Sequence, residues 1–265
     1  MSTTTTPAPV LSMTGVSKRF GAVQALKDIE FDVAAGEVVA LVGDNGAGKS
    51  TLVKTIAGVY APDGGEVVFD GNPVTITSPS EAQNLGIATV FQDLALCDNL
   101  DVVGNLFLGN ERKHAGALDE VTMEKESWRL LRELSAKIPS VRIPVASLSG
   151  GQRQTVAIAR SLLGEPKVVM LDEPTAALGV AQTAEVLNLV ERLRERGLGV
   201  ILISHNMSDV MAVADRVAVL RLGRNNGVYR VADTSSQEII AAITGATTNA
   251  VTARAARRAP QEEQS

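Results

Sequence analysis

The fold of this chain is decided by the stretch Gly43-Asp44-Asn45-Gly46-Ala47-Gly48-Lys49-Ser50-Thr51. The apolar run before it, residues 38–42, predicts a buried strand, and residues 52–57 after it have the composition of a helix. A glycine-rich loop that joins a strand to a helix and ends in Gly-Lys-Ser is the P-loop pattern. The glycines let successive backbone N–H groups point at one anion, and the helix start adds a partial positive charge. We therefore predict that residues 43–51 bind the phosphates of a nucleoside triphosphate.

Two side chains of this loop have separate roles in that prediction. Lys49 is long enough to reach the outer phosphates, and the hydroxyl of Ser50 can bind the Mg²⁺ that accompanies them. The alternative is an ordinary glycine-rich turn, and it becomes weaker with each partner motif found downstream.

Composition limits the classes of protein to which the chain can belong. Of its 265 residues, 45% are hydrophobic and 3% aromatic, so the core must consist of valine, leucine, isoleucine and alanine. The net charge of −5 argues against a nucleic acid as partner, because nucleic-acid binding normally needs a basic surface. A single cysteine, Cys97, excludes an internal disulfide, and no apolar run approaches the ~20 residues of a membrane span. These features predict an intracellular protein that reaches a membrane only through a partner.

Between two polar tails, residues 1–9 and 246–265, which we predict to be disordered, short apolar strands alternate with helical segments. The expected strands are residues 11–16, 29–33, 38–42, 66–69, 167–171, 200–204 and 217–222, the last of which runs toward an Asn226-Gly227 hairpin turn.

Residues 93–164 instead show helical spacing and no convincing β run. Residues 181–196 predict an amphipathic helix with Leu187, Val190 and Leu193 turned inward, ended by Gly197. We therefore predict an α/β fold of the P-loop NTPase class. Its RecA-like parallel core comprises residues 10–92 and 165–245, with an N-terminal antiparallel β subdomain and a helical subdomain inserted at 93–164.

A second motif places two acids at the end of a buried strand. Residues 168–171 are Val-Val-Met-Leu, and Asp172, Glu173 and Pro174 follow. Such a strand delivers Asp172 to the place where the Mg²⁺ of a P-loop site is held. Glu173 would then face a water in line with the γ-phosphate and act as general base.

A third motif, Leu148-Ser149-Gly150-Gly151-Gln152, begins another helix and allows two interpretations. Ser149 and Gln152 have the spacing of a capping box. A glycine-rich helix start is also an anion site. Since the P-loop already binds the phosphates, a second anion site is expected where the nucleotide lies between two molecules.

The order of these three motifs resembles the ATP-binding subunits of ABC transporters, over about residues 11–240. We call residues 148–152 the signature for that reason. The resemblance implies ATP and Mg²⁺ as cofactors, ATP hydrolysis, and contacts from Ser149, Gly150, Gly151 and Gln152 to nucleotide bound by a second subunit. It also implies peripheral attachment to membrane permease subunits at the cytoplasmic face of the cell membrane, with a solute-binding protein outside acting indirectly. With one motif of each kind per chain, a homodimer is the simpler assembly.

The resemblance also assigns three residues outside the motifs. Gln92 matches the glutamine that binds Mg²⁺ and contacts the membrane partner, and His205 matches a histidine that bonds the γ-phosphate. Phe20 matches an aromatic residue that stacks on adenine. On residue type alone, Phe20 fits the core equally well, and His205 fits a capped or core histidine better.

One position departs from the family pattern. The loop after the catalytic acid usually ends in Leu-Asp, whereas this chain has Leu178-Gly179. The absent carboxylate normally helps to tie the two subunits together, so its loss puts the strength of that coupling in doubt.

Residues 92–102 and 173–180 are similar to those of bacterial monosaccharide importers of the ribose, xylose and fructose group. The resemblance therefore implies import of a monosaccharide. An importer of another small solute, a soluble ABC ATPase that acts on ribosomes or chromosomes, and a P-loop module that binds without hydrolysis are the alternatives.

Overall fold

The computed structural model describes residues 8–245, so the predicted C-terminal tail and most of the N-terminal one lie outside the described residues. Strand β1 begins at Pro9, the last residue of the predicted N-terminal tail. Among the described residues, each helix is too short or too polar to span a bilayer.

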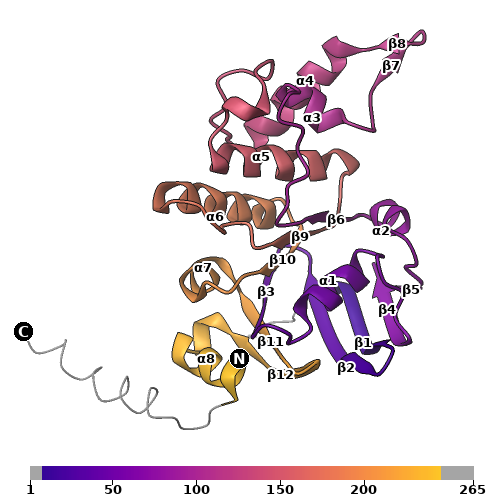
Figure 1. The fold of residues 1–265 in the computed structure, drawn as a ribbon, viewed down its shortest axis with the longest axis vertical. Coiled ribbons are helices and arrows are strands. Elements are labelled where there is room, and N and C mark those ends of the chain that lie inside the picture. The colour runs from indigo at the N-terminus through magenta and orange to yellow at the C-terminus, as the bar shows by residue number, and fades with distance from the viewer. Residues whose placement is uncertain (1–7, 246–265) are drawn as a thin grey trace, which may run out of the picture.

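A six-stranded sheet forms the centre of the molecule, with strand order β12-β11-β3-β10-β9-β6 (Figure 1). Its strands are β3 (Val38–Gly43), β6 (Ile87–Val90), β9 (Val168–Asp172), β10 (Gly199–Ile203), β11 (Arg216–Arg221) and β12 (Arg224–Arg230). All neighbours are parallel except β11 and β12, which form an antiparallel hairpin. The predicted parallel core is therefore confirmed.

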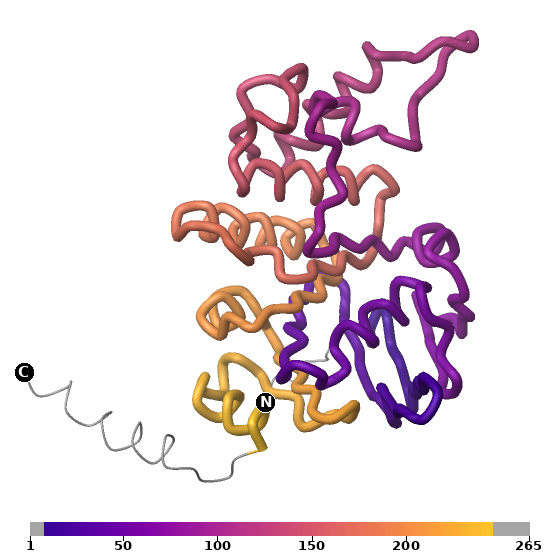
Figure 2. Tube along the Cα trace, viewed as in Figure 1, coloured from indigo at the N-terminus to yellow at the C-terminus, as the bar shows by residue number. Residues whose placement is uncertain are grey.

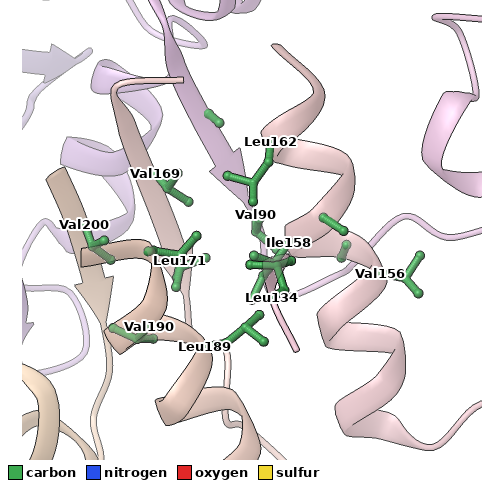
Figure 3. Close-up of a cluster of buried hydrophobic side chains, with 14 of the residues drawn as sticks. Val90, Leu134, Val156, Ile158, Leu162, Val169, Leu171, Leu189, Val190 and Val200 are labelled. Atoms are coloured by element: carbon green, nitrogen blue, oxygen red, sulfur yellow. The ribbon is translucent and has the colours of Figure 1, made fainter. Parts of the chain in front are cut away.

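Alternate side chains of each strand enter two different hydrophobic clusters. In β3, Val38, Ala40 and Val42 belong to one cluster, and Val39 and Leu41 belong to the other. The first cluster packs the sheet against α5 (Gly150–Ser161) and α6 (Val180–Glu195), as Figure 3 shows for Val169 and Leu171. The second packs it against α1 (Lys49–Ile56) and the N-terminal β subdomain. Because successive strand residues point to opposite faces, α1 and α5 lie on opposite faces of the sheet.

The N-terminal β subdomain is a four-stranded antiparallel sheet, as predicted. Its order is β2-β1-β4-β5, with β1 (Pro9–Phe20), β2 (Val23–Ala34), β4 (Gly64–Phe69) and β5 (Asn72–Val74). Helix α2 (Pro79–Leu85) connects it to β6. Figure 1 shows this sheet beside α1, at the end of the molecule opposite α4.

The segment between β6 and β9 holds α3 (Val102–Phe107), α4 (Glu120–Glu133) and α5, which gather at one end of the molecule (Figure 2). It also holds the antiparallel pair β7 (Lys113–His114) and β8 (Ala117–Leu118), so the expectation of no β structure here was wrong. Strands of two residues are too short to produce an alternating pattern in the sequence. The single tryptophan, Trp128, is half-buried on α4 and packs against the first cluster.

Helix α6 ends before Gly197, as predicted, and buries Val190 and Leu193. Leu187 was predicted to point inward but is only half-buried. Val186 and Leu189 are buried instead. The chain closes with α7 (Met207–Val213) and α8 (Ser236–Thr244), and short 3₁₀ turns lie at Val145–Ser147, Leu162–Gly164 and Val231–Asp233.

The predicted turn at Asn226-Gly227 was wrong, although the hairpin exists. The turn lies at Leu222 and Gly223, whose φ angles are 50° and 74°. Asn226 and Gly227 lie within β12. The pairing of β11 with β12 shifts register between Ala218 and Leu220 of β11, and this shift produces a bulge. Contacts distant in sequence fix this arrangement, because Lys27 N–H donates to Gly223 O at 2.7 Å and Gly223 N–H donates to Ala47 O at 3.0 Å.

Candidate functional site

The P-loop connects β3 to α1, as predicted. Gly48 is the N-cap of α1 with φ of 106°, and a Cβ there would lie 2.9 Å from Ala25 O, so only glycine fits. Lys49 Nζ donates to Gly43 O at 2.6 Å and to Asp44 O at 3.1 Å. The ammonium group therefore lies over the loop whose N–H groups would meet the phosphates.

Burial lowers the pKa of Lys49, and nearby carboxylates oppose that shift: Glu173 most, then Asp44 and Asp172. Glu173 and Asp172 belong to the next motif, so the two predicted motifs lie within electrostatic reach of each other. An anion bound at the loop would favour the charged lysine further.

One edge of the central sheet brings together the P-loop, Gln92, Asp172, Glu173 and His205. Leu41 of β3 is level with Ile203 of β10, and Ile203 is level with Asp172 of β9. The P-loop, His205 and Glu173 follow these positions directly, and Glu173 N–H donates to Ile203 O at 2.9 Å. Gln92 leaves β6 at the same edge, because Val90 is level with Leu171. In open parallel sheets ligands bind beyond this carboxyl edge.

Glu173 and His205 form a pair, with His205 Nδ1 at 2.8 Å from Glu173 Oε2. Glu173 is largely covered, with 15% of its side chain exposed, whereas His205 is 75% exposed. The backbone of Glu173 has φ of 50°, a strained conformation for a non-glycine residue, and such strain concentrates at functional sites. Because His205 is this exposed, the interpretation of His205 as a core histidine was wrong.

Burial raises the pKa of Asp172, and the neighbouring Glu173 raises it further, while Lys49 and Lys54 act in the opposite direction. A cation at Asp172 would relieve this repulsion. Within residues 8–245 no group of three or more His, Cys, Asp or Glu side chains is arranged to hold a metal. The predicted set, Ser50, Gln92 and Asp172, offers hydroxyl, amide and carboxylate oxygens. Such hard donors suit Mg²⁺, which keeps several waters and takes further ligands from phosphates.

The signature begins α5 with the predicted capping box, because Ser149 N–H donates to Gln152 Oε1 at 2.9 Å and Gln152 N–H donates to Ser149 Oγ at 3.3 Å. The capping interpretation is therefore confirmed. At the next position, a Cβ on Gly150 would lie 2.8 Å from Leu178 Cδ2, so a larger residue there would require the end of the Leu178 side chain to move. This helix start belongs to the face of the sheet opposite α1, so within one chain it does not share a face with the P-loop helix.

Phe20 lies at the end of β1 and is 41% exposed, so the core interpretation was wrong. Tyr60 meets it edge-on with ring centroids 5.0 Å apart, and Lys18 Nζ lies 5.6 Å from the centre of the Phe20 ring. Sequence reasoning missed Tyr60, because only the fold brings residues 20 and 60 together. An exposed ring held by two neighbours can present a face to a nucleobase.

Gly179 is the N-cap of α6, with φ of −74° and no side-chain cap. A Cβ at this position meets nothing within 4 Å. Neither backbone strain nor crowding therefore requires glycine where the family pattern has aspartate. Sequence reasoning also missed Asp209, buried on α7, whose Oδ2 accepts from Thr175 Oγ1 at 2.6 Å and fixes the loop after Glu173.

The chain is similar to a family model, to curated proteins and to solved structures of one kind. The family model described as ABC transporter matches residues 26–176. The chain is 45% identical to the fructose import ATP-binding protein FrcA of Rhizobium meliloti over 90% of this chain and 95% of that protein. It is 44% identical to the xylose/arabinose import ATP-binding protein XylG of Sulfolobus acidocaldarius, over 89% and 94%. It is 42% identical to a ribose import ATP-binding protein of Rubrobacter xylanophilus over 89% of this chain, but spans only 47% of that protein.

Two solved structures extend the comparison. An ATP-binding cassette of an ABC transporter in its ADP conformation superposes with a TM-score of 0.77 and 28% identity, over 90% of this chain and 96% of that chain. A dimeric cassette in a post-hydrolysis state, bound to ADP and Pi, superposes with a TM-score of 0.69 and 26% identity, over 83% and 98%.

Proposed function

This chain belongs to the ABC transporter family of ATP-binding subunits, and we propose that it hydrolyses ATP to power the import of a monosaccharide through a membrane permease. The observation that carries the proposal is the meeting of Lys49, Asp172, Glu173 and His205 beyond neighbouring parallel strands. The names of the relatives support the sugar, since fructose and xylose/arabinose import proteins match nearly end to end.

The residues divide the work of hydrolysis. The loop 43–51 binds the phosphates, and Glu173 accepts the proton of the attacking water. His205 contacts Glu173 through Nδ1, and in this proposal it also bonds the γ-phosphate. Phe20 receives the adenine. Ser50, Gln92 and Asp172 would hold Mg²⁺, which when bound would compensate the charge of the phosphates.

We propose that two copies of this chain form the functional unit. The P-loop helix and the signature helix lie on opposite faces of the sheet, which supports contacts from Ser149 and Gly151 to nucleotide on another subunit. The dimeric relative bound to ADP and Pi supports such an arrangement. Permease subunits are then expected at the loop that follows Gln92, at the cytoplasmic face of the membrane, with a solute-binding protein outside.

Phosphate release tests the chemistry. The purified protein should release phosphate from Mg-ATP, and Lys49→Ala should abolish both this release and binding of a labelled ATP analogue. Arg129→Leu, which removes an exposed arginine of α4, is the matched control. Wild-type affinity in Lys49→Ala would refute the P-loop assignment.

Uptake of a labelled monosaccharide by cells tests the proposed role in import. In cells, Lys49→Ala should remove high-affinity uptake of a labelled monosaccharide, and the wild-type chain should co-purify with an integral membrane protein. Co-sedimentation with ribosomes and unchanged uptake would instead favour a soluble ABC ATPase.

A further inference from the structure

The segment that follows Gln92 is attached to the signature helix by two arginine side chains, of which Arg153 lies with Nη1 3.4 Å from Asp98 Oδ1. Arg160, near the end of α5, donates from Nη2 to Leu94 O at 2.7 Å and from Nη1 to Ala95 O at 2.9 Å. Ser149 begins the same helix. One rigid element therefore has the signature at its start and the segment after Gln92 bound near its end.

The environment of Arg160 is unusual for a charged residue. Its side chain is half-buried, burial lowers its pKa, and within residues 8–245 it makes no ion pair. It lines a cleft of about 330 Å³ together with Phe91 and Asp93. A partly buried guanidinium without a carboxylate is costly, and here its donors go to two backbone carbonyls instead. Packing alone would be served by an apolar side chain.

The rest of the segment is also bound on the α5 side. Ala146 N–H donates to Asp98 O at 3.1 Å, and Val145 N–H donates to Leu100 O at 2.9 Å. The buried amide of Asn105 on α3 bonds both the N–H and the carbonyl of Cys97, at 2.7 and 2.9 Å. Before Gln92, in contrast, β6 is hydrogen-bonded into the central sheet. Gln92 therefore lies where attachment to the sheet ends and attachment to the helices begins.

Arg160 binds the segment at its most strained residue. Ala95 has φ of 48°, a left-handed conformation that is unfavourable for a residue with a Cβ. Its N–H donates to Asp93 Oδ1 at 3.1 Å, and its carbonyl accepts from Arg160. Without the guanidinium, the backbone at Ala95 has less reason to keep this conformation.

We propose that Arg160 is a positioning residue that makes residues 94–100 and the signature helix move as one piece, so that a displacement at Gln92 reaches Ser149 and Gly151. This inference rests on the proposed function, in which Gln92 meets the Mg-nucleotide of its own subunit and the signature meets nucleotide on the other.

The single cysteine provides a direct test of the attachment, because Cys97 lies in the segment and is half-buried. Arg160→Leu keeps an apolar side chain but removes both donors. We expect a maleimide to label Cys97 about tenfold faster in this variant, the factor that corresponds to one charge-assisted hydrogen bond. Binding of an ATP analogue should stay within about twofold, because the P-loop lies on the other face of the sheet.

Two further variants separate positioning from general stability. Arg160→Lys keeps one donating group, so Cys97 should be labelled at an intermediate rate in this variant. If Arg160→Leu does not fold, the labelling rate in Arg160→Lys decides whether Arg160 holds the segment. Arg129→Leu, an exposed arginine on α4, should label as wild type. A wild-type labelling rate in Arg160→Leu, or equal acceleration in Arg129→Leu, would overturn the proposal.

A second measurement tests the transmission. In a Glu173→Gln background, where ATP should hold two subunits together, Arg160→Leu should need about tenfold more Mg-ATP for dimerisation at unchanged monomer affinity for the nucleotide. If Arg160→Leu speeds the labelling of Cys97 but leaves the Mg-ATP concentration needed for dimerisation unchanged, the proposed transmission from Gln92 to the signature is overturned. If Glu173→Gln with Arg160 intact stays monomeric, the proposed dimer fails, and the labelling rates still decide whether Arg160 holds the segment.

Discussion

At the scale of single residues, the sequence predicted the positions of the candidate groups best where one motif lies on one loop. Residues 43–51 follow one another in the sequence, and so do Asp172 and Glu173. The residue types and spacing within each motif therefore predict the roles of its members. Tyr60 and Arg160 were missed because each acts on a segment tens of residues away. No local pattern marks such a contact.

Phe20→Ala should weaken ATP binding by about 1–3 kcal/mol, the cost of removing one base–aromatic stack, while the rate at saturating ATP changes little. Titration with a fluorescent ATP analogue and steady-state hydrolysis measure the two effects. Val23→Ala removes another exposed apolar side chain of the same hairpin and serves as control. Equal affinity of both variants would separate Phe20 from the nucleotide.

The pKa of Asp172 predicts how Mg²⁺-dependent binding responds to acid. Burial and Glu173 raise this pKa, so the carboxyl takes up a proton at higher pH than an ordinary aspartate. Mg²⁺-dependent ATP binding should therefore weaken as the pH falls through that raised value. The same sign means that protonation of Asp172 stabilises the nucleotide-free fold. Asp172→Asn should bind weakly at every pH, and an acid limb that persists unchanged in that variant would point to another group.

At the scale of elements, strands and helices followed from periodicity, and the error at the β11–β12 turn arose because tertiary contacts decide it. The β11–β12 turn lies at Leu222-Gly223 rather than at Asn226-Gly227, because Asn225 bonds the N–H and the carbonyl of Glu30, both at 2.8 Å, and fixes the register. The capping box at Ser149 was predictable because both partners lie within one turn.

Gly179→Asp should strengthen α6. The position has φ of −74° and open space, and glycine has no side chain that could cap the helix. An aspartate there can accept from the first backbone N–H groups, which is worth a few tenths of a kcal/mol over glycine. Chemical denaturation measures this gain, with Gly179→Ala as the variant that cannot cap. If the carboxylate also ties two subunits together, Gly179→Asp should dimerise at lower Mg-ATP concentration.

At the scale of the whole molecule, α1 and α5 lie on opposite faces of the sheet, and the proposed site therefore needs two subunits. Glu173→Gln should lower hydrolysis about 10²- to 10⁴-fold, because it removes the base and keeps the shape. ATP would then persist between two subunits. Light scattering with Mg-ATP should show a stable dimer of this variant and a transient one of the wild type. A slow variant that stays monomeric at high concentration would indicate a different partner ATPase.

The position of Trp128 also gives the molecule a local optical reporter. The indole lies on α4, so its fluorescence emission reports on the helical end, whereas far-ultraviolet circular dichroism averages over every helix and strand. Because Trp128 packs against the cluster that also holds β3 and β9 of the central sheet, we expect both signals to change at one temperature on heating. An emission change that precedes the loss of dichroism would mean that the helical end melts by itself.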